Sequence, residues 1–71
     1  MKNEEVDKEH YAKLSIEPLD YAEANNLDIL EFSIIKYVSR WRFKNGIVDL
    51  KKARWYLDRL IAREERNAYD R

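Results

Sequence analysis

Apolar side chains recur at helical spacing along most of the chain, and turn-forming residues divide this pattern into segments. Pro18 suits the first turn of a short helix, because its missing N–H needs no partner there. Asn25-Asn26 then ends that helix, since asparagine tolerates the left-handed conformation. Asp28 and Glu31 have the spacing of a capping box, in which each side chain binds a backbone N–H at a helix start. A second helix is therefore expected to begin directly after the first.

The single glycine divides the remaining pattern into two long helices. Gly46 supplies a left-handed stop for the second helix, and Asp49 is expected to cap the third. The sequence therefore predicts an all-α, small three-helix domain, with helices over about 18–25, 28–45 and 49–69.

The third helix has one apolar stripe, which is typical of a helix packed on a core. Trp55 lies on roughly the opposite side at 100° per residue. It is interpreted as a lone exposed aromatic side chain or as a contact with another chain. The stripe consists of Leu50, Ala53, Leu57, Leu60, Ile61 and Ala68.

The second helix is apolar on two sides, and such helices are usually buried on two sides. A 71-residue chain has a marginal core, and without cysteine it has no disulfide to reinforce that core. We therefore expect self-association into a homo-oligomer, with the second helix near the interface. The alternative is that the first and third helices each cover one face within a monomer. One face carries Leu30, Ile34, Tyr37, Val38 and Trp41, and the other carries Phe32, Ile35 and Phe43.

Length and composition indicate one domain preceded by a short acidic segment. Residues 1–9 lack an apolar period and are expected to be flexible, whereas residues 10–71 are expected to form a single helical domain. No apolar run approaches membrane-spanning length, and the N-terminus does not resemble a signal peptide. These features predict no membrane partner and a cytoplasmic location.

The neutral total charge conceals a strong asymmetry along the chain. Residues 1–32 carry nine acidic residues and three lysines, whereas residues 33–59 carry eight basic residues and two aspartates. A neutral total makes nucleic acid an unlikely partner, but a local basic cluster can hold a small anion. The alternative is that the acidic and basic segments only neutralise each other within the fold.

The basic residues of the second helix recur at spacings of four, so they are expected to line one side of it. Arginine binds a phosphate or carboxylate with two parallel hydrogen bonds, and lysine acts as a point charge. This ladder consists of Lys36, Arg40 and Lys44, with Lys52 nearby in the third helix. Such a cluster would suit the phosphates of a nucleotide, with Tyr37 available to stack on its base. Alternatively, the basic side chains lie over the apolar helix with their charged ends in water.

Other candidate chemistry is sparse. The sequence has no phosphate-binding glycine loop, no cysteine and one histidine. Glu17, Asp20 and Asp49 are candidates for holding magnesium beside a phosphate, but each also lies where a helix N-terminus favours an acid. His10 is a candidate acid–base group that lacks an obvious partner. No catalytic residue, metal site or cofactor is therefore predicted.

Several short strings match a known family in order. They are His10-Tyr11, Ile16-Glu17-Pro18, Asp20-Tyr21, Ala24-Asn25-Asn26-Leu27, Ile35-Lys36-Tyr37-Val38, Arg40, Lys44-Asn45-Gly46, Asp49-Leu50, Lys52-Ala53 and Trp55-Tyr56-Leu57. Together they resemble a family of small bacteriophage proteins catalogued as a domain of unknown function. Its members are often labelled nucleotide kinase, because a similar segment occurs in an early nucleotide kinase of a coliphage. The match covers about residues 10–61.

The resemblance implies nucleotide handling in the cytoplasm of a phage-infected bacterium. The candidate ligand-binding residues are His10, Tyr11, Asn25, Lys36, Tyr37, Arg40, Lys44 and Lys52. We expect a homo-oligomeric binding protein, rather than an enzyme, which acts as a sponge for a nucleotide or a nucleotide-derived messenger of bacterial immunity. One alternative is a nucleotide kinase or phosphohydrolase, and another is an inhibitor that binds a host protein.

Overall fold

The computed structural model describes residues 14–70, and every regular element in this part of the chain is helical. α2 spans Pro18–Ala24, α3 spans Ile29–Arg40, and α4 spans Ile47–Asp70. A 3₁₀ turn, η1 (Trp41–Phe43), joins α3 to the loop before α4. The expected all-α, three-helix fold is confirmed. The expected flexibility of residues 1–9 concerns residues outside those described.

Local signals set the first two helices as expected. Pro18 occupies the first turn of α2, and Asn26 beyond its end has a φ of 55°. The capping box of α3 is formed, because Glu31 N donates to Asp28 Oδ1 at 2.9 Å and Asp28 N donates to Glu31 Oε1 at 3.0 Å. The short link between α2 and α3 is therefore fixed by backbone preference and by side-chain capping.

The second helix is shorter than predicted. α3 ends at Arg40 rather than near residue 45, and the chain tightens into η1. Gly46 has a φ of 57°, and its N–H donates to the carbonyl of Trp41 at 2.9 Å. The predicted left-handed stop at Gly46 is therefore confirmed, but the chain has already left the α conformation before it. Lys44 consequently does not continue the helical line of Lys36 and Arg40.

The third helix begins earlier than predicted. α4 starts at Ile47, because the carbonyl of Gly46 accepts from Asp49 N at 3.0 Å and from Leu50 N at 3.4 Å. Asp49 therefore lies inside the first turn, and the expectation that it caps the helix from outside is wrong. An acid in this turn still interacts favourably with the helix dipole.

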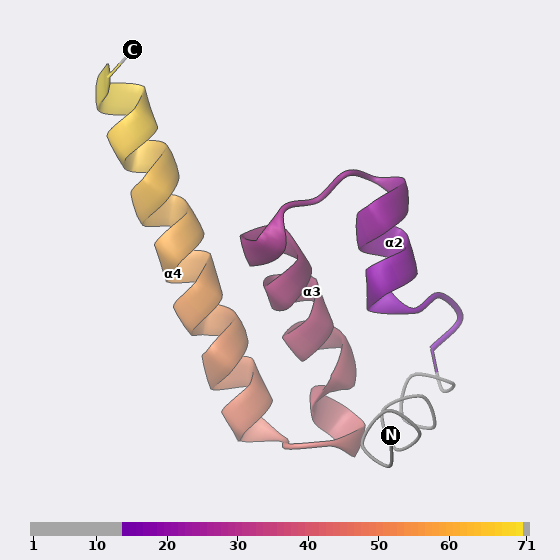
Figure 1. Cartoon of the computed structure of the whole chain (residues 1–71). Helices are drawn as coiled ribbons and strands as arrows, with labels where there is room; N and C mark the ends of the chain where they lie inside the picture. The colour runs from indigo at the N-terminus through magenta and orange to yellow at the C-terminus, as the bar shows by residue number, and fades with distance from the viewer. Residues whose placement is uncertain (1–13, 71) are drawn as a thin grey trace.

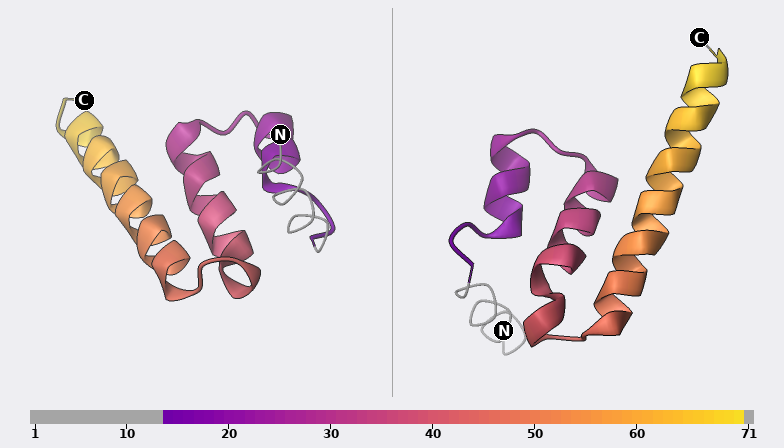
Figure 2. Two further views of the ribbon diagram at one scale, coloured as in Figure 1. Left: turned by 60° about the horizontal axis from the view of Figure 1, so that its bottom comes forward. Right: turned by 180° about the vertical axis from the view of Figure 1, so that it is seen from behind.

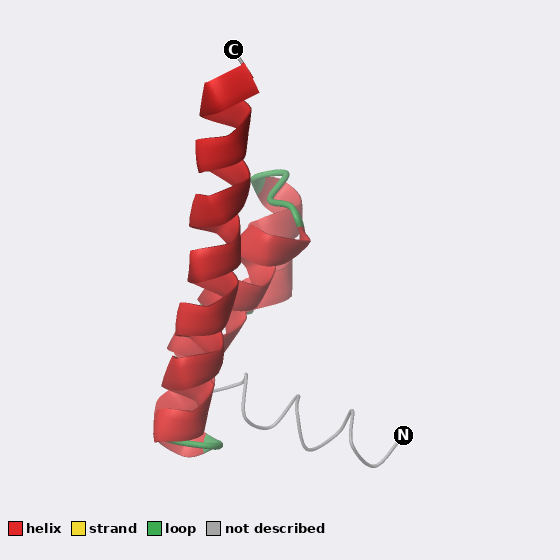
Figure 3. Cartoon of the chain, turned by 90° about the vertical axis from the view of Figure 1, so that its left-hand side faces the viewer, coloured by secondary structure: helices red, strands yellow, loops and turns green. Residues whose placement is uncertain are grey.

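The three α-helices lie side by side, with α3 between α4 and α2 (Figures 1 and 2). In the edge-on view, α4 lies in front of the other two helices (Figure 3). With 24 residues against 12, α4 is about 36 Å long and α3 about 18 Å. The C-terminal half of α4 therefore extends past the end of α3, as Figure 1 shows.

This arrangement buries little apolar surface. Ala22, Ala53 and Pro18 are buried, but the larger aliphatic and aromatic side chains of the described residues keep part of their surface exposed. α2 and α4 do cover two sides of α3, as the monomer alternative supposed. The two remaining sides of α3 lie on the broad faces of the layer. Self-association of the chain therefore remains a prediction.

Helical spacing places different side chains on the two broad faces. Lys36 of α3 lies on the same side as Lys52 of α4, because both ammonium groups lie over the ring of Tyr37. We call this side the cationic face. The opposite side, which we call the apolar face, exposes Val38, Leu57 and Ile61.

The predicted stripe of α4 is only partly covered by α3. Ala53 is buried, but Leu57 and Ile61 are 43% and 47% exposed. Trp55 is 56% exposed, as expected for a residue outside the core stripe. Within residues 14–70, no helix has both the length and the apolar character needed to cross a membrane.

Candidate functional site: a cation–aromatic cluster

Two tyrosines form the centre of the cationic face. Tyr37 of α3 and Tyr56 of α4 are stacked, with ring centroids 5.7 Å apart and planes inclined by 10°. Trp55 meets Tyr56 edge-on at a centroid distance of 5.0 Å. The rings therefore form a continuous aromatic strip that crosses from α3 to α4.

Three cations surround the ring of Tyr37. Arg40 Cζ lies 4.6 Å from the ring centroid, Lys52 Nζ 5.4 Å and Lys36 Nζ 5.7 Å. A cation within about 6 Å of an aromatic centroid is attracted by the negative face of the ring. We call these four residues together with Tyr56 the Tyr37 cluster.

Arg40 also makes an ion pair beneath this cluster. Its Nε donates to Asp49 Oδ2 at 3.2 Å, and its second terminal nitrogen donates to Oδ1 at 3.3 Å. The side chains are 7% and 0% exposed. Asn45 completes the arrangement, since its backbone N–H donates to Asp49 Oδ2 at 3.2 Å and its side-chain amide to Oδ1 at 3.4 Å. The carboxylate therefore ties together the end of α3, the loop and the start of α4.

The pKa of Asp49 reflects two opposing influences. Burial raises the pKa of this carboxyl group, because removal from water disfavours the charged form. The hydrogen bonds from Arg40 and Asn45 outweigh burial and hold the pKa of Asp49 below its ordinary value. Asp49 is therefore a carboxylate at neutral pH, and its charge offsets that of Arg40.

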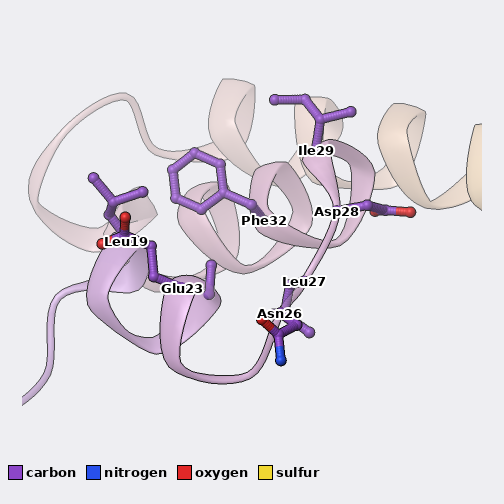
Figure 4. Close-up of a pocket in the computed structure, with 8 residues that line it drawn as sticks. Leu19, Glu23, Asn26, Leu27, Asp28, Ile29 and Phe32 are labelled. Carbon is purple, nitrogen blue, oxygen red and sulfur yellow. The ribbon is translucent and has the colours of Figure 1, made fainter.

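A hollow of about 480 Å³ lies beside the cluster, between the end of α2 and the start of α3 (Figure 4). Leu19 and Phe32 lie close together on its apolar side, and Lys36 Nζ lies 5.9 Å from the Phe32 ring centroid. The hollow and the Tyr37 cluster therefore adjoin. Its lining consists of Leu19, Ala22, Glu23, Asn26, Leu27, Asp28, Ile29 and Phe32.

An ion pair between Asp28, which lines the hollow, and Arg63 connects the hollow to α4. Arg63 Nη1 lies 2.7 Å from Asp28 Oδ2, and Arg63 Nε lies 3.1 Å from Glu64 Oε2. The pKa of Asp28 is lowered, first by the backbone hydrogen bond from Glu31 and then by the hydrogen bond from Arg63. This ion pair is partly exposed to water, which weakens it, so it orients side chains more than it stabilises the fold.

The structure brings together four of the eight predicted ligand-binding residues. Lys36, Tyr37, Arg40 and Lys52 all belong to the Tyr37 cluster. Lys44 lies in the turn between η1 and α4. Asn25 lies at the end of α2, where its side-chain amide donates to the Tyr21 carbonyl at 2.9 Å. The remaining two, His10 and Tyr11, lie outside the described residues.

Two members of the site were missed as such by sequence reasoning. Tyr56 was absent from the predicted ligand residues, although its position three residues after buried Ala53 places it on the α3 side of α4. Asp49 was expected to be a helix cap or a magnesium ligand, whereas its carboxylate is occupied by Arg40 and Asn45. The signal for this pairing was that Asp49 is the single acidic residue between Glu31 and Asp58, in the most basic part of the sequence.

The arrangement is suited to binding an anion that carries an aromatic ring. Lys36 and Lys52 bring two ammonium groups to one ring from two different helices. The stacked tyrosines offer further aromatic surface beside them. Stacking on an aromatic side chain contributes about 1–3 kcal/mol per base. Among the described residues, no group of three or more acidic, histidine or cysteine side chains is placed to hold a metal ion.

Comparison with known proteins identifies one family. The family model described as a protein of unknown function, DUF3310, matches residues 5–58. No curated protein and no solved structure gives a significant match.

Proposed function

We propose that this chain, which belongs to the DUF3310 family, binds a nucleotide or a nucleotide-derived signalling molecule through the Tyr37 cluster. The observation that carries the proposal is the convergence of Lys36, Arg40 and Lys52 on the ring of Tyr37. Like charges repel one another, and a bound phosphate offsets that repulsion. Asp49 already offsets Arg40, so the phosphate is assigned to the two lysines.

The members of the cluster have different roles in this proposal. Lys36 and Lys52 contact the phosphate groups as point charges, and the tyrosine rings contact the base. Arg40 is buried against Asp49, which offsets its charge, so its role is to position Tyr37. His10, Tyr11, Asn25 and Lys44 remain predicted contacts with other parts of the ligand.

The biological role proposed is sequestration. A protein that binds a messenger tightly without altering it lowers the messenger's free concentration and blocks its signal. The proposed setting is the cytoplasm of a phage-infected bacterium, where the messenger would belong to an immune response. The resemblance to small phage proteins supports this setting, and the cation–aromatic cluster supports the ligand class.

Recovery of the ligand after binding tests the proposal. The purified protein is incubated with a panel of mono-, di- and cyclic nucleotides, separated from unbound ligand, and heated to release what it holds. Recovery of an intact nucleotide supports sequestration. Recovery of an altered nucleotide supports the kinase or phosphohydrolase alternative. Failure to bind any nucleotide, together with capture of a host protein, supports the inhibitor alternative and contradicts the proposal.

Lysine variants test the site itself. Lys36→Ala or Lys52→Ala each removes one proposed phosphate contact, and affinity is expected to fall about tenfold, as a charged hydrogen bond of about 1.5 kcal/mol implies. Lys51→Ala is the matched control, because Lys51 is also an exposed lysine of α4 but is turned by one residue away from the cluster. Equal losses in all three variants, measured by titration calorimetry at fixed salt, would count against a localised site.

A further inference from the structure

We propose that two copies of this chain form a twofold dimer, in which Trp55 of each copy enters the hollow between α2 and α3 of the other. The proposal concerns a protein interface and stands independently of the proposed ligand. Its occupant is a second copy of the chain, because the hollow is apolar with acidic groups in its lining, whereas Trp55 and Arg59 offer an exposed apolar ring with a cation beside it.

The hollow has the properties of a receiving site. Its volume of about 480 Å³ falls within the range of about 300–1,000 Å³ that is usual for ligand sites. Leu19 and Ile29 line it while remaining 54% and 70% exposed, so apolar surface is open to a partner. Glu23 and Asp28 add acidic groups to the same lining.

The outer edge of α4 exposes an aromatic ring with a cation beside it, in contrast to the acidic hollow. Trp55 is 56% exposed, and Arg59 one turn later lies over its ring at 5.3 Å. An aromatic ring with an arginine stacked on it is a common centre of a protein interface, since tryptophan and arginine are enriched among the residues that dominate binding energy. The guanidinium of Arg59 would meet Glu23 as the indole ring enters the apolar part of the hollow.

Contacts on the cationic face connect these two features. Trp55 meets Tyr56, Tyr56 stacks on Tyr37, and Lys36 lies over both Tyr37 and Phe32. Phe32 lines the hollow. Both features therefore belong to the same face of the molecule. A twofold axis lying in the plane of that face, midway between the two features, exchanges them, so both contacts form at once in a closed dimer.

The charge distribution of the chain favours this pairing over other orientations. Residues 17–24, at the α2 edge, carry three acidic residues and no basic ones, whereas residues 47–59, in the first half of α4, carry four basic residues and two aspartates, of which Asp49 is paired with Arg40 of α3. Because α2 and α4 form opposite edges of the layer, a twofold dimer of this kind places each basic edge on an acidic edge. Such complementary charge steers association and disfavours other pairings.

Charge reversal at the two ends of the contact tests the proposal. Glu23→Lys and Arg59→Glu each place like charges at both contacts of a homodimer, so the dimer dissociation constant of each variant is expected to rise about tenfold or more. A mixture of the two variants forms heterodimers in which both contacts are again of opposite charge. Sedimentation should therefore show weak self-association of each variant and restored dimers in the mixture.

Alanine variants on the two faces give a second readout. Trp55→Ala is expected to weaken the dimer at least tenfold, whereas Val38→Ala, at an apolar position of similar exposure on the opposite face, is expected to leave it unchanged. Circular dichroism of each variant checks that the helices are retained. A native protein that stays monomeric at millimolar concentration overturns the proposal. A dimer that is weakened by Val38→Ala also overturns it, because the interface would then lie on the apolar face. A mixture of the two charge variants that forms no dimers overturns it as well, because Glu23 and Arg59 would then not face each other.

Discussion

At the scale of single residues, the main feature is a buried ion pair in contact with the half-buried ring of Tyr37. Arg40 and Asp49 are 7% and 0% exposed at their side chains, and Asn45 satisfies the remaining acceptor capacity of the carboxylate. Removing one partner of a buried pair leaves a charge without compensation, whereas removing both is often nearly neutral. The cationic face therefore depends on a pair that is itself electrically balanced.

Arg40→Ala is expected to lower the free energy of unfolding by about 3–5 kcal/mol, because it leaves the Asp49 carboxylate buried and partly unpaired. A domain of this size has only about 4–11 kcal/mol in total, so the variant should be close to unfolding at room temperature. Urea denaturation followed by circular dichroism measures the change. If Arg40→Ala proves as stable as the native chain, the pair does not support the fold as described.

The double variant Arg40→Met with Asp49→Asn serves as the control, because it removes both charges and keeps an acceptor for the Asn45 N–H. Most of the lost stability should return. The pH dependence gives an independent check. Since the folded-state pKa of Asp49 is lowered, its stabilising contribution is complete above the unfolded pKa of about 4 and is lost as pH falls through the folded value. The double variant should lose less stability over this acid range than the native chain.

At the scale of elements, the loop between α3 and α4 depends on Gly46. Its φ of 57° lies in the left-handed region, and no atom lies within 4 Å of the position that an added Cβ would occupy. Gly46→Ala should therefore cost about 1–2 kcal/mol from backbone strain alone, with no steric clash. Gly46→Asn should cost less, because asparagine tolerates this conformation. In thermal unfolding, the melting temperature should be highest for the native chain, lower for Gly46→Asn and lowest for Gly46→Ala. Equal melting temperatures would contradict the role given to Gly46.

Helix starts and stops that depend on neighbouring residues were predictable from the sequence. The Asp28–Glu31 capping box and the left-handed Gly46 are both present as predicted. The end of α3 at Arg40 and the start of α4 at Ile47 could not be predicted in this way, because they depend on contacts between the two helices. A sequence pattern gives the spacing of cations within one helix, but it does not show that Arg40 meets Asp49 across a loop. The cluster was therefore predicted in part, without Tyr56 and without the buried acid.

At the scale of the whole molecule, the cationic face carries both the proposed ligand site and the proposed dimer contacts. Tyr37 lies between Trp55 and the hollow along the chain of contacts, so the clusters of two copies would lie near each other in the dimer. The like charges of the two clusters oppose the complementary contacts at the edges, and an anion bound between the clusters would reduce that repulsion.

If both proposals hold, a bound nucleotide should tighten the dimer, and dimer formation should tighten nucleotide binding by the same factor. Sedimentation with and without the best-binding nucleotide measures the first effect. Lys36→Ala should weaken this linkage while leaving the Trp55 contact in place. A nucleotide that binds but leaves the dissociation constant of the dimer unchanged would separate the two sites.

The different lengths of the helices have a consequence for how the domain opens. The first turns of α4 are held by the buried Asp49 and by Ala53 against α3, so we expect their backbone amides to exchange slowly. Beyond Arg63, which reaches the start of α3 at Asp28, the helix depends on its own side-chain pairs, such as Asn67 with Glu64. A free helical segment this short is marginal in water. One continuous helix is therefore expected to open slowly at its first turns and to fray readily at its last ones.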